Sequence, residues 1–302
     1  MIRRRTALAL ALVAPLCVLV GREGLAQGRA TRATTFRVMT FNIRYDFPND
    51  GPNRWPHRLP VVAKVIRESG AAVIGLQEDK GEQIDDLRAH LPGYEFLGRG
   101  RNATGSGERC AIVVKTDDVR VRDSGDVWFS DTPDVAGSNT WGDRYPRKFT
   151  WALLEVKRSK TSLLVLNTHF PERDDGNDPA NRVRGARLMR EWLDQRVPSR
   201  ERDKVAVLVL GDYNSQPDDQ PRALLAGEGS GALRDAFVEA RAPEKSPGTV
   251  NPNFSGARTN SRIDWILLGG PLRARGYQKI DEQVDGRWPS DHYPVMADVE
   301  LR

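Results

Sequence analysis

The sequence predicts one α/β domain in which short strands and a few helices are joined by long loops. Eight short apolar, β-branched runs are separated by Gly, Pro and Asp residues, which is the pattern of strands. Four other stretches carry apolar residues at helical spacing. No segment repeats at a fixed period and no low-complexity linker divides the 302 residues, so a single domain is the simplest partition.

The expected strands lie at residues 36–43, 73–77, 111–115, 150–156, 162–168, 205–210, 263–268 and 295–301. The expected helices lie at residues 59–69, 80–89, 182–196 and 220–225; in the first, Val62, Val65 and Ile66 fall on one face. The long loops are at residues 44–58, 126–148, 170–181 and 240–261. Long loops in a compact domain often carry functional residues, so we expect them to shape a binding cleft.

The N-terminus has the pattern of a secretory signal peptide. Three arginines at 3–5 precede an apolar stretch at 6–20, and small residues at 24–26 supply a cleavage site. The apolar stretch is shorter than the roughly 20 residues of a membrane span, although an uncleaved anchor is the alternative. We predict a signal peptide at 1–27, a disordered leader at 28–35 and one domain at 36–302. The mature protein is then exported to the periplasm or the medium without a transmembrane anchor.

Cleavage would also change the charge of the chain. The segment 1–27 holds four Arg and one Glu, so 42 basic and 40 acidic residues remain and the net charge falls from +5 to +2. A nearly balanced charge argues against a protein that coats nucleic acid. Only Cys110 remains of the two cysteines, which excludes an internal disulfide, and four histidines are too few for a Cys/His zinc framework.

Polar residues of one small set stand at or beside six of the apolar strands. They are Asn42, Glu78, His169, Asp212 with Asn214, Asp264, and Asp291 with His292. A charge buried without a partner costs several kcal/mol, roughly, so six such cases along one chain favour a shared polar site over six unrelated strand ends. The set contains no Ser or Cys nucleophile beside a base and no Gly-rich phosphate loop. Its carboxylate and amide oxygens suit Mg²⁺, or Mn²⁺, better than zinc.

At these positions the sequence resembles the endonuclease/exonuclease/phosphatase superfamily, whose best-known fold is that of pancreatic deoxyribonuclease. The resemblance is carried by TFNIRYD (40–46), LQED (76–79), NTHF (167–170), GDYNSQP (211–217), RIDWIL (262–267) and SDHYPV (290–295). These motifs follow one another in order over residues 36–302 and are most similar to secreted bacterial members and the deadenylase-like branch. The resemblance implies a four-layer α/β/β/α sandwich with two mostly antiparallel sheets and a cleft at one edge.

The resemblance also implies roles for individual residues. Glu78 corresponds to the principal Mg²⁺ ligand, with Asn42 and Asp291 beside the metal. Asp212 corresponds to the residue that orients or deprotonates the attacking water, and Asn214 to the donor that holds the phosphate. His292 corresponds to the imidazole at the scissile phosphate, with Asp264 as its carboxylate partner, and His169 to a second phosphate contact.

These roles imply a secreted, Mg²⁺-dependent phosphoester hydrolase that uses in-line attack of water on phosphorus. A phosphodiesterase acting on nucleic acid is the first specific hypothesis. A small-molecule or lipid phosphoesterase, sphingomyelinase-like or acting on inositol phosphates, is the alternative, and a non-catalytic binding protein of the same fold is a third. Trp55, Arg58 and Arg147 lie in the long loops, and we expect them to contact the phosphoester substrate. We expect no obligate protein partner.

Overall fold

The computed structural model describes residues 34–172, 178–198, 201–229, 231–242 and 247–302. The predicted signal peptide and most of the predicted leader lie outside these residues. The last two leader residues, Thr34 and Thr35, instead begin a strand. None of the described helices is long and apolar enough to cross a membrane.

Two six-stranded sheets form the centre of the molecule. In spatial order, the first contains β11 (Leu272–Lys279), β12 (Val295–Leu301), β1 (Thr34–Asn42), β2 (Val73–Gln77), β4 (Ile112–Lys115) and β3 (Tyr94–Leu97). The second contains β5 (Val119–Trp128), β6 (Lys148–Val156), β7 (Thr161–His169), β8 (Ala206–Asp212), β10 (Asp264–Gly269) and β9 (Arg234–Asp235). All neighbouring strands run antiparallel except one parallel pair in each sheet, β1–β2 and β7–β8.

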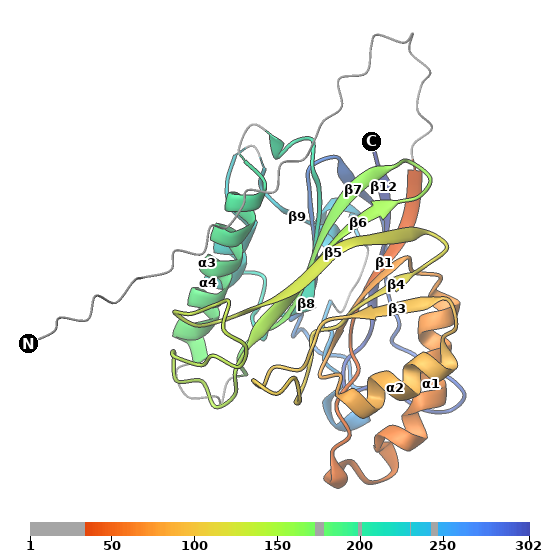
Figure 1. Ribbon diagram of the computed structural model, residues 1–302. Helices are drawn as coiled ribbons and strands as arrows, with labels where there is room; N and C mark the ends of the chain where they lie inside the picture. The colour runs from red at the N-terminus through yellow and green to blue at the C-terminus, as the bar shows by residue number, and fades with distance from the viewer. Residues whose placement is uncertain (1–33, 173–177, 199–200, 230, 243–246) are drawn as a thin grey trace, which may run out of the picture.

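The helices cover the outer faces of the two sheets and complete four layers (Figure 1). They are α1 (Trp55–Ser69), α2 (Gly81–His90), α3 (Asp178–Arg196) and α4 (Gln220–Ala226). The short α5 (Ala236–Glu239) instead contacts β10 and β11, with Ala236 in the core between the sheets, and 3-10 turns lie at Pro48–Asn53 and Pro252–Phe254. One apolar core lies between the sheets and includes Val38 of the first sheet and Leu208 of the second. Two outer cores join α1 and α2 to the first sheet and α3 and α4 to the second. This arrangement confirms the expected four-layer α/β/β/α sandwich.

The four strands that the sequence analysis missed are β3, β5, β9 and β11, and each is an edge strand of its sheet. An edge strand is covered on fewer sides than a central one, and natural edges carry charges that prevent pairing with other chains. β5 and β11 contain several charged residues, so neither reads as an apolar run. Helix α1 also begins earlier than predicted, at Trp55, with a proline in its first turn.

The parallel pair in each sheet brings strand ends that are distant in sequence to one edge of the sandwich. Asn42 pairs with Gln77 at the ends of β1 and β2, and His169 pairs with Asp212 at the ends of β7 and β8. Strand β10 runs antiparallel to β8, so it starts at this edge with Asp264 opposite Asp212. The loop before β12 reaches the same edge because β12 is antiparallel to β1.

Buried amides join the two sheets close to this edge. Gln77 on β2 donates through Nε2 to Asn167 Oδ1 on β7 at 2.7 Å, and Asn167 Nδ2 donates to the Leu76 carbonyl at 2.7 Å. Gly75 makes this approach feasible, because a Cβ at that position would lie only 2.5 Å from Asn167 Oδ1. The sheets are therefore held together by hydrogen bonds, as well as by apolar packing, near the site.

Candidate active site

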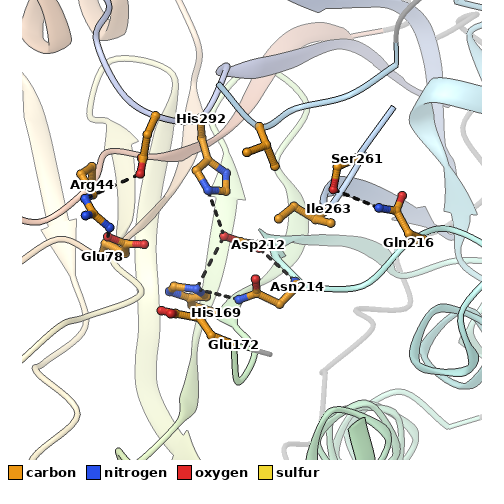
Figure 2. A pocket seen from close by; sticks show the side chains of 12 residues that line it. Arg44, Glu78, His169, Glu172, Asp212, Asn214, Gln216, Ser261, Ile263 and His292 are labelled. Atoms are coloured by element: carbon orange, nitrogen blue, oxygen red, sulfur yellow. Dashed lines mark hydrogen bonds and ion pairs between the residues drawn. The ribbon is translucent and has the colours of Figure 1, made fainter. Parts of the chain in front are cut away.

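A cleft of about 360 Å³ opens at the shared edge of the two sheets. Its lining residues are Arg44, Glu78, His169, Glu172, Asp212, Asn214, Gln216, Val250, Ser261, Ile263, Asp291 and His292 (Figure 2). Six of the predicted site residues line the cleft, and Asn42 and Asp264 lie directly behind it, hydrogen-bonded to residues that do. Polar side chains from six separate motifs thus converge on one site.

Asp212 occupies the centre of the cleft, between the two imidazoles (Figure 2). Its Oδ2 accepts a hydrogen bond from Asn42 Nδ2 at 3.0 Å and lies 3.5 Å from His169 Nε2 and 3.8 Å from His292 Nε2. Burial, and then the charge of Asp264, raise the pKa of Asp212 to about 7. A carboxylate in this state takes up a proton near neutral pH, which suits a group that accepts a proton from water.

The half-buried His292 and the buried Asp264 form a pair at one side of Asp212. His292 Nδ1 lies 2.9 Å from Asp264 Oδ2. Burial alone lowers the pKa of His292, but the charges of Asp264 and Asp212 outweigh it and raise the pKa well above its usual value. The two carboxylates therefore favour the charged form of the imidazole, whose Nε2 faces Asp212. The Thr249 hydroxyl accepts from the Asp264 amide, while the Thr249 carbonyl accepts from the Tyr293 amide, so this residue joins the two segments.

His169 is neutral in the same cleft. Burial, followed by the nearby charge of Arg147, lowers its pKa well below the usual value. Asn214 Nδ2 donates to the Phe170 carbonyl and to His169 Nε2, both at 3.0 Å, so this ring nitrogen is the acceptor. Asn214 adopts a left-handed backbone conformation with φ of 46°, and its backbone N–H donates to Asp212 Oδ1. Both amide hydrogens of Asn214 are thus used within the protein, and its expected donation to phosphate stays a prediction.

The carboxylate of Glu78 is buried on the opposite side of the cleft. Glu78 Oε1 accepts from Asn42 Nδ2 at 3.1 Å and Oε2 accepts from the Tyr45 amide at 3.2 Å. Burial, and then the charge of Asp291, raise the pKa of Glu78 to about 7. The guanidinium of Arg44 lies 3.8 Å from Glu78 and 3.6 Å from Asp291, so both carboxylates share one cation.

This group of residues fits a divalent cation. Its donors are hard carboxylate oxygens, and burial of neighbouring negative charges is costly unless a cation compensates it. Glu78 and Asp291 are the residues that would hold the ion, with Asn42 orienting Glu78 by its hydrogen bond. Glu172 adds a further carboxylate, because its oxygen, one from Glu78 and a His169 nitrogen all lie within 4.8 Å of one another.

Several lining residues were not among the predicted site residues. Arg44 lies inside the quoted motif TFNIRYD, and its position two residues after Asn42 was the signal that could have identified it. Glu172 follows NTHF by two residues, and Gln216 lies within GDYNSQP. Ser261 lies next to RIDWIL, at the end of a loop that we expected to be functional.

Trp55 and Arg58 are both buried and neither lines the cleft, so their expected contacts with substrate stay predictions. Trp55, the first residue of α1, packs in the outer core between the helices and the first sheet, and its Nε1 donates to Asp86 at 2.8 Å. Arg147 is also buried, and its Nη2 lies 3.5 Å from Glu172 at the mouth of the cleft. Its contact with substrate stays a prediction.

The side chain of Arg58 supports two segments that form the cleft. Its guanidinium is fully buried and donates to the carbonyls of Asn53, Ile43, Arg44 and Pro289. These bonds connect the segment after β1 to the loop before β12, the two segments that carry Arg44 and Asp291. Burial lowers the pKa of Arg58 to about 10, so the guanidinium stays charged at neutral pH.

Replacing Arg58 by Met is expected to lower the free energy of unfolding by roughly 2–5 kcal/mol, because several buried carbonyls lose their donor. Urea denaturation measures the change. Arg67→Met, an exposed position on the same helix, is the matched control and is expected to unfold like the wild type. Equal midpoints for the two variants would contradict the supporting role.

The sequence profile of the endonuclease/exonuclease/phosphatase family matches residues 39–292. An endonuclease/exonuclease/phosphatase from Bacteroides vulgatus is 27% identical, with a TM-score of 0.78 over 89% of this chain and 100% of that chain. A mannosyl-6-phosphatase from Bacteroides thetaiotaomicron is 28% identical, with a TM-score of 0.77 over 87% and 99%.

TDP2 from D. rerio, in complex with a single-strand DNA product, is 18% identical, with a TM-score of 0.66 over 88% and 99%, and shows the fold alone. A comparison with curated protein sequences found no match. The profile match, the sandwich and the convergent acids and imidazoles agree: the chain belongs to the endonuclease/exonuclease/phosphatase family of phosphoester hydrolases.

Proposed function

We propose that this enzyme is a Mg²⁺-dependent hydrolase of phosphate monoesters of small molecules. The observation that carries the proposal is the charge of the cleft. Among the described lining residues the one Arg or Lys is Arg44, against four carboxylates, and that guanidinium is already shared with Asp50, Glu78 and Asp291. A single phosphate meets the imidazoles and the metal site, whereas the flanking phosphates of a nucleic acid would meet carboxylates.

Two further observations support a small substrate. The cleft volume falls within the usual range of sites for small molecules, about 300–1,000 Å³. A structural neighbour of 28% identity is a mannosyl-6-phosphatase, which acts on a phosphate monoester. The nucleic-acid phosphodiesterase expected from the sequence remains the competing hypothesis.

In the proposed reaction, water attacks phosphorus and the bond between phosphorus and the alcohol oxygen breaks. The departing alkoxide takes up a proton from solvent, the proton taken from water is later released to solvent, and inorganic phosphate and the neutral alcohol leave. Asp212 takes the proton from water at Oδ2. His292, held by Asp264, donates from Nε2 to charge on the phosphate oxygens. A phosphate oxygen next to His169 can accept the hydrogen that Asn214 now gives to the imidazole. A divalent cation, when bound at Glu78 and Asp291, neutralises phosphate charge.

A substrate panel tests the proposal. We expect hydrolysis of 4-nitrophenyl phosphate with Mg²⁺ or Mn²⁺, loss of activity in EDTA and recovery when the ion is restored. The kcat/KM for monoesters should exceed that for bis(4-nitrophenyl) phosphate and for single-stranded RNA and DNA. Activity that survives EDTA would overturn the metal requirement, and a higher kcat/KM on nucleic acid would favour the competing hypothesis.

We also propose that the enzyme is exported, on the basis of the N-terminal sequence pattern alone. Expression of the full chain in a Gram-negative host should yield periplasmic or secreted protein whose N-terminus, by Edman sequencing, begins near residue 28. An intact Met1 on exported protein would contradict cleavage, and retention in the cytoplasm would contradict export.

A further inference from the structure

The two sides of the cleft differ in chemistry. Arg44, Glu78 and Asp291 lie together on one side, as a cluster of charged groups. On the other side lie Gln216, Val250, Ser261 and Ile263, which we call the neutral wall. Figure 2 shows Gln216, Ser261 and Ile263 across the cleft from Arg44 and Glu78, with Asp212 between them. The phosphate site is thus adjacent to a surface without charged side chains.

The neutral wall combines apolar faces with hydrogen-bonding groups. Val250 and Ile263 are half-buried, so each leaves part of an apolar side chain open to the cleft. Gln216 Nε2 donates to Ser261 Oγ at 3.0 Å, which leaves the Ser261 hydroxyl hydrogen to donate to a ligand. Gln216 Oε1 accepts from the Arg262 amide at 3.2 Å. The amide that orients Ser261 is therefore itself held by the backbone.

The neutral wall is also fixed relative to the catalytic groups. Val250 pairs with His292 in an isolated antiparallel bridge. The Ile263 carbonyl accepts from the Tyr213 amide, one residue after Asp212. The Thr249 amide donates to the Ser261 carbonyl at 2.8 Å. An alcohol attached to a phosphate between His169 and His292 would therefore lie against this wall.

We infer that the neutral wall binds the alcohol part of the substrate and that this alcohol is an uncharged polyol such as a sugar. A sugar has apolar C–H faces, which fit Val250 and Ile263, and hydroxyls, which fit the donor of Ser261. A second phosphate or a carboxylate on the alcohol would find no cation among the described residues of the wall. The inference rests on the proposed monoesterase function, and it assigns binding of the alcohol to Ser261 and Ile263.

The test compares kcat/KM for mannose 6-phosphate and glucose 6-phosphate with kcat/KM for 4-nitrophenyl phosphate, which has no sugar hydroxyls. Ser261→Ala removes the donor and Ile263→Ala removes apolar contact. Ser261→Ala is expected to lower the ratio of hexose phosphate to 4-nitrophenyl phosphate by about tenfold, the loss that accompanies one hydrogen bond. Ile263→Ala is expected to lower kcat/KM for both substrates, because the nitrophenyl ring and the C–H face of a sugar both need apolar contact. Ser162→Ala, at the far end of β7, is the control and should keep the wild-type ratio.

The ratio is independent of the fraction of folded enzyme. Thermal unfolding of each variant shows whether a fall in kcat/KM itself reflects loss of fold. An unchanged ratio in Ser261→Ala, or an unchanged kcat/KM for both substrates in Ile263→Ala, would overturn the inference. So would a wild-type enzyme that hydrolyses 4-nitrophenyl phosphate but neither hexose phosphate, while the proposed function would stand. A wild-type enzyme that hydrolyses no monoester would overturn the proposed function itself.

Discussion

Replacing Asp212 by Asn is expected to lower kcat by about 10²–10⁴-fold, the usual contribution of a positioned acid–base group. The amide nearly matches the carboxylate in shape but cannot take a proton from water. The fold should survive with a melting temperature close to that of the wild type, because the loss of a buried charge offsets the loss of one acceptor for Asn42 or Asn214. Burial raises the pKa of Asp212 to about 7, which means that the folded state disfavours its charged form. Removing that charge therefore removes a destabilising interaction at neutral pH.

Steady-state kinetics on 4-nitrophenyl phosphate and thermal unfolding measure the two effects of Asp212→Asn. The control is Asp218→Asn, an exposed position in the segment that follows β8, where neither quantity should change. A variant at 212 that keeps more than a tenth of wild-type turnover would refute the role of this residue as proton acceptor. A large fall in melting temperature would refute the expected near-neutral effect on stability.

Replacing Glu78 by Gln is expected to lower the affinity for Mg²⁺ by more than roughly 10–100-fold. That range is the loss caused by removing a residue that only supports the metal ligands. Glu78 supplies a buried carboxylate beside Asp291, and its neutral analogue removes one of the negative charges that attract the ion. Activity at a fixed low Mg²⁺ concentration should fall at least as far as affinity does. Excess Mg²⁺ should restore part of the activity if binding alone is impaired.

Calorimetric titration with Mg²⁺, and paramagnetic resonance with Mn²⁺, measure the affinity of the Glu78→Gln variant without relying on turnover. Glu82→Gln, an exposed position in the first turn of α2, is the matched control. Wild-type affinity for both ions in the Glu78 variant would show that the cation is held elsewhere. The group formed by Asp212, Asp264 and His292 would then be the next candidate.

The central strands were predictable because burial on both faces selects continuous apolar sequence, as in VIGLQ of β2 and AVLVLGD of β8. The edge strands were not, since half-exposed backbone imposes little constraint on side chains. The start of α1 was missed for a related reason. Its first turn contains Trp55, Pro56 and Arg58, which are equally compatible with a loop, and only tertiary burial distinguishes the two.

The site was predictable where a polar residue interrupts an apolar run, because that costs free energy unless the residue has a partner or a function. This reasoning led to Glu78, Asp212 and Asp264. This reasoning does not identify arginines, because they are common on protein surfaces and the sequence does not distinguish a buried arginine from an exposed one. Arg58 was therefore assigned to substrate although it binds four carbonyls. The pairing of Gln216 with Ser261 joins residues 45 positions apart, and no local pattern reports it.

Asn42 lies on β1 in the first sheet, yet its amide nitrogen donates both to Glu78 and, across the sandwich, to Asp212. Half of the catalytic groups belong to each sheet, and this amide, with the Gln77–Asn167 and His292–Asp264 hydrogen bonds, fixes the spacing between them. A displacement of one sheet relative to the other would lengthen the hydrogen bonds of Asn42 and increase the distance between Glu78 and Asp212. Exchanging large and small side chains in the core between the sheets, far from the metal ligands, should therefore lower kcat even where the free energy of unfolding changes little.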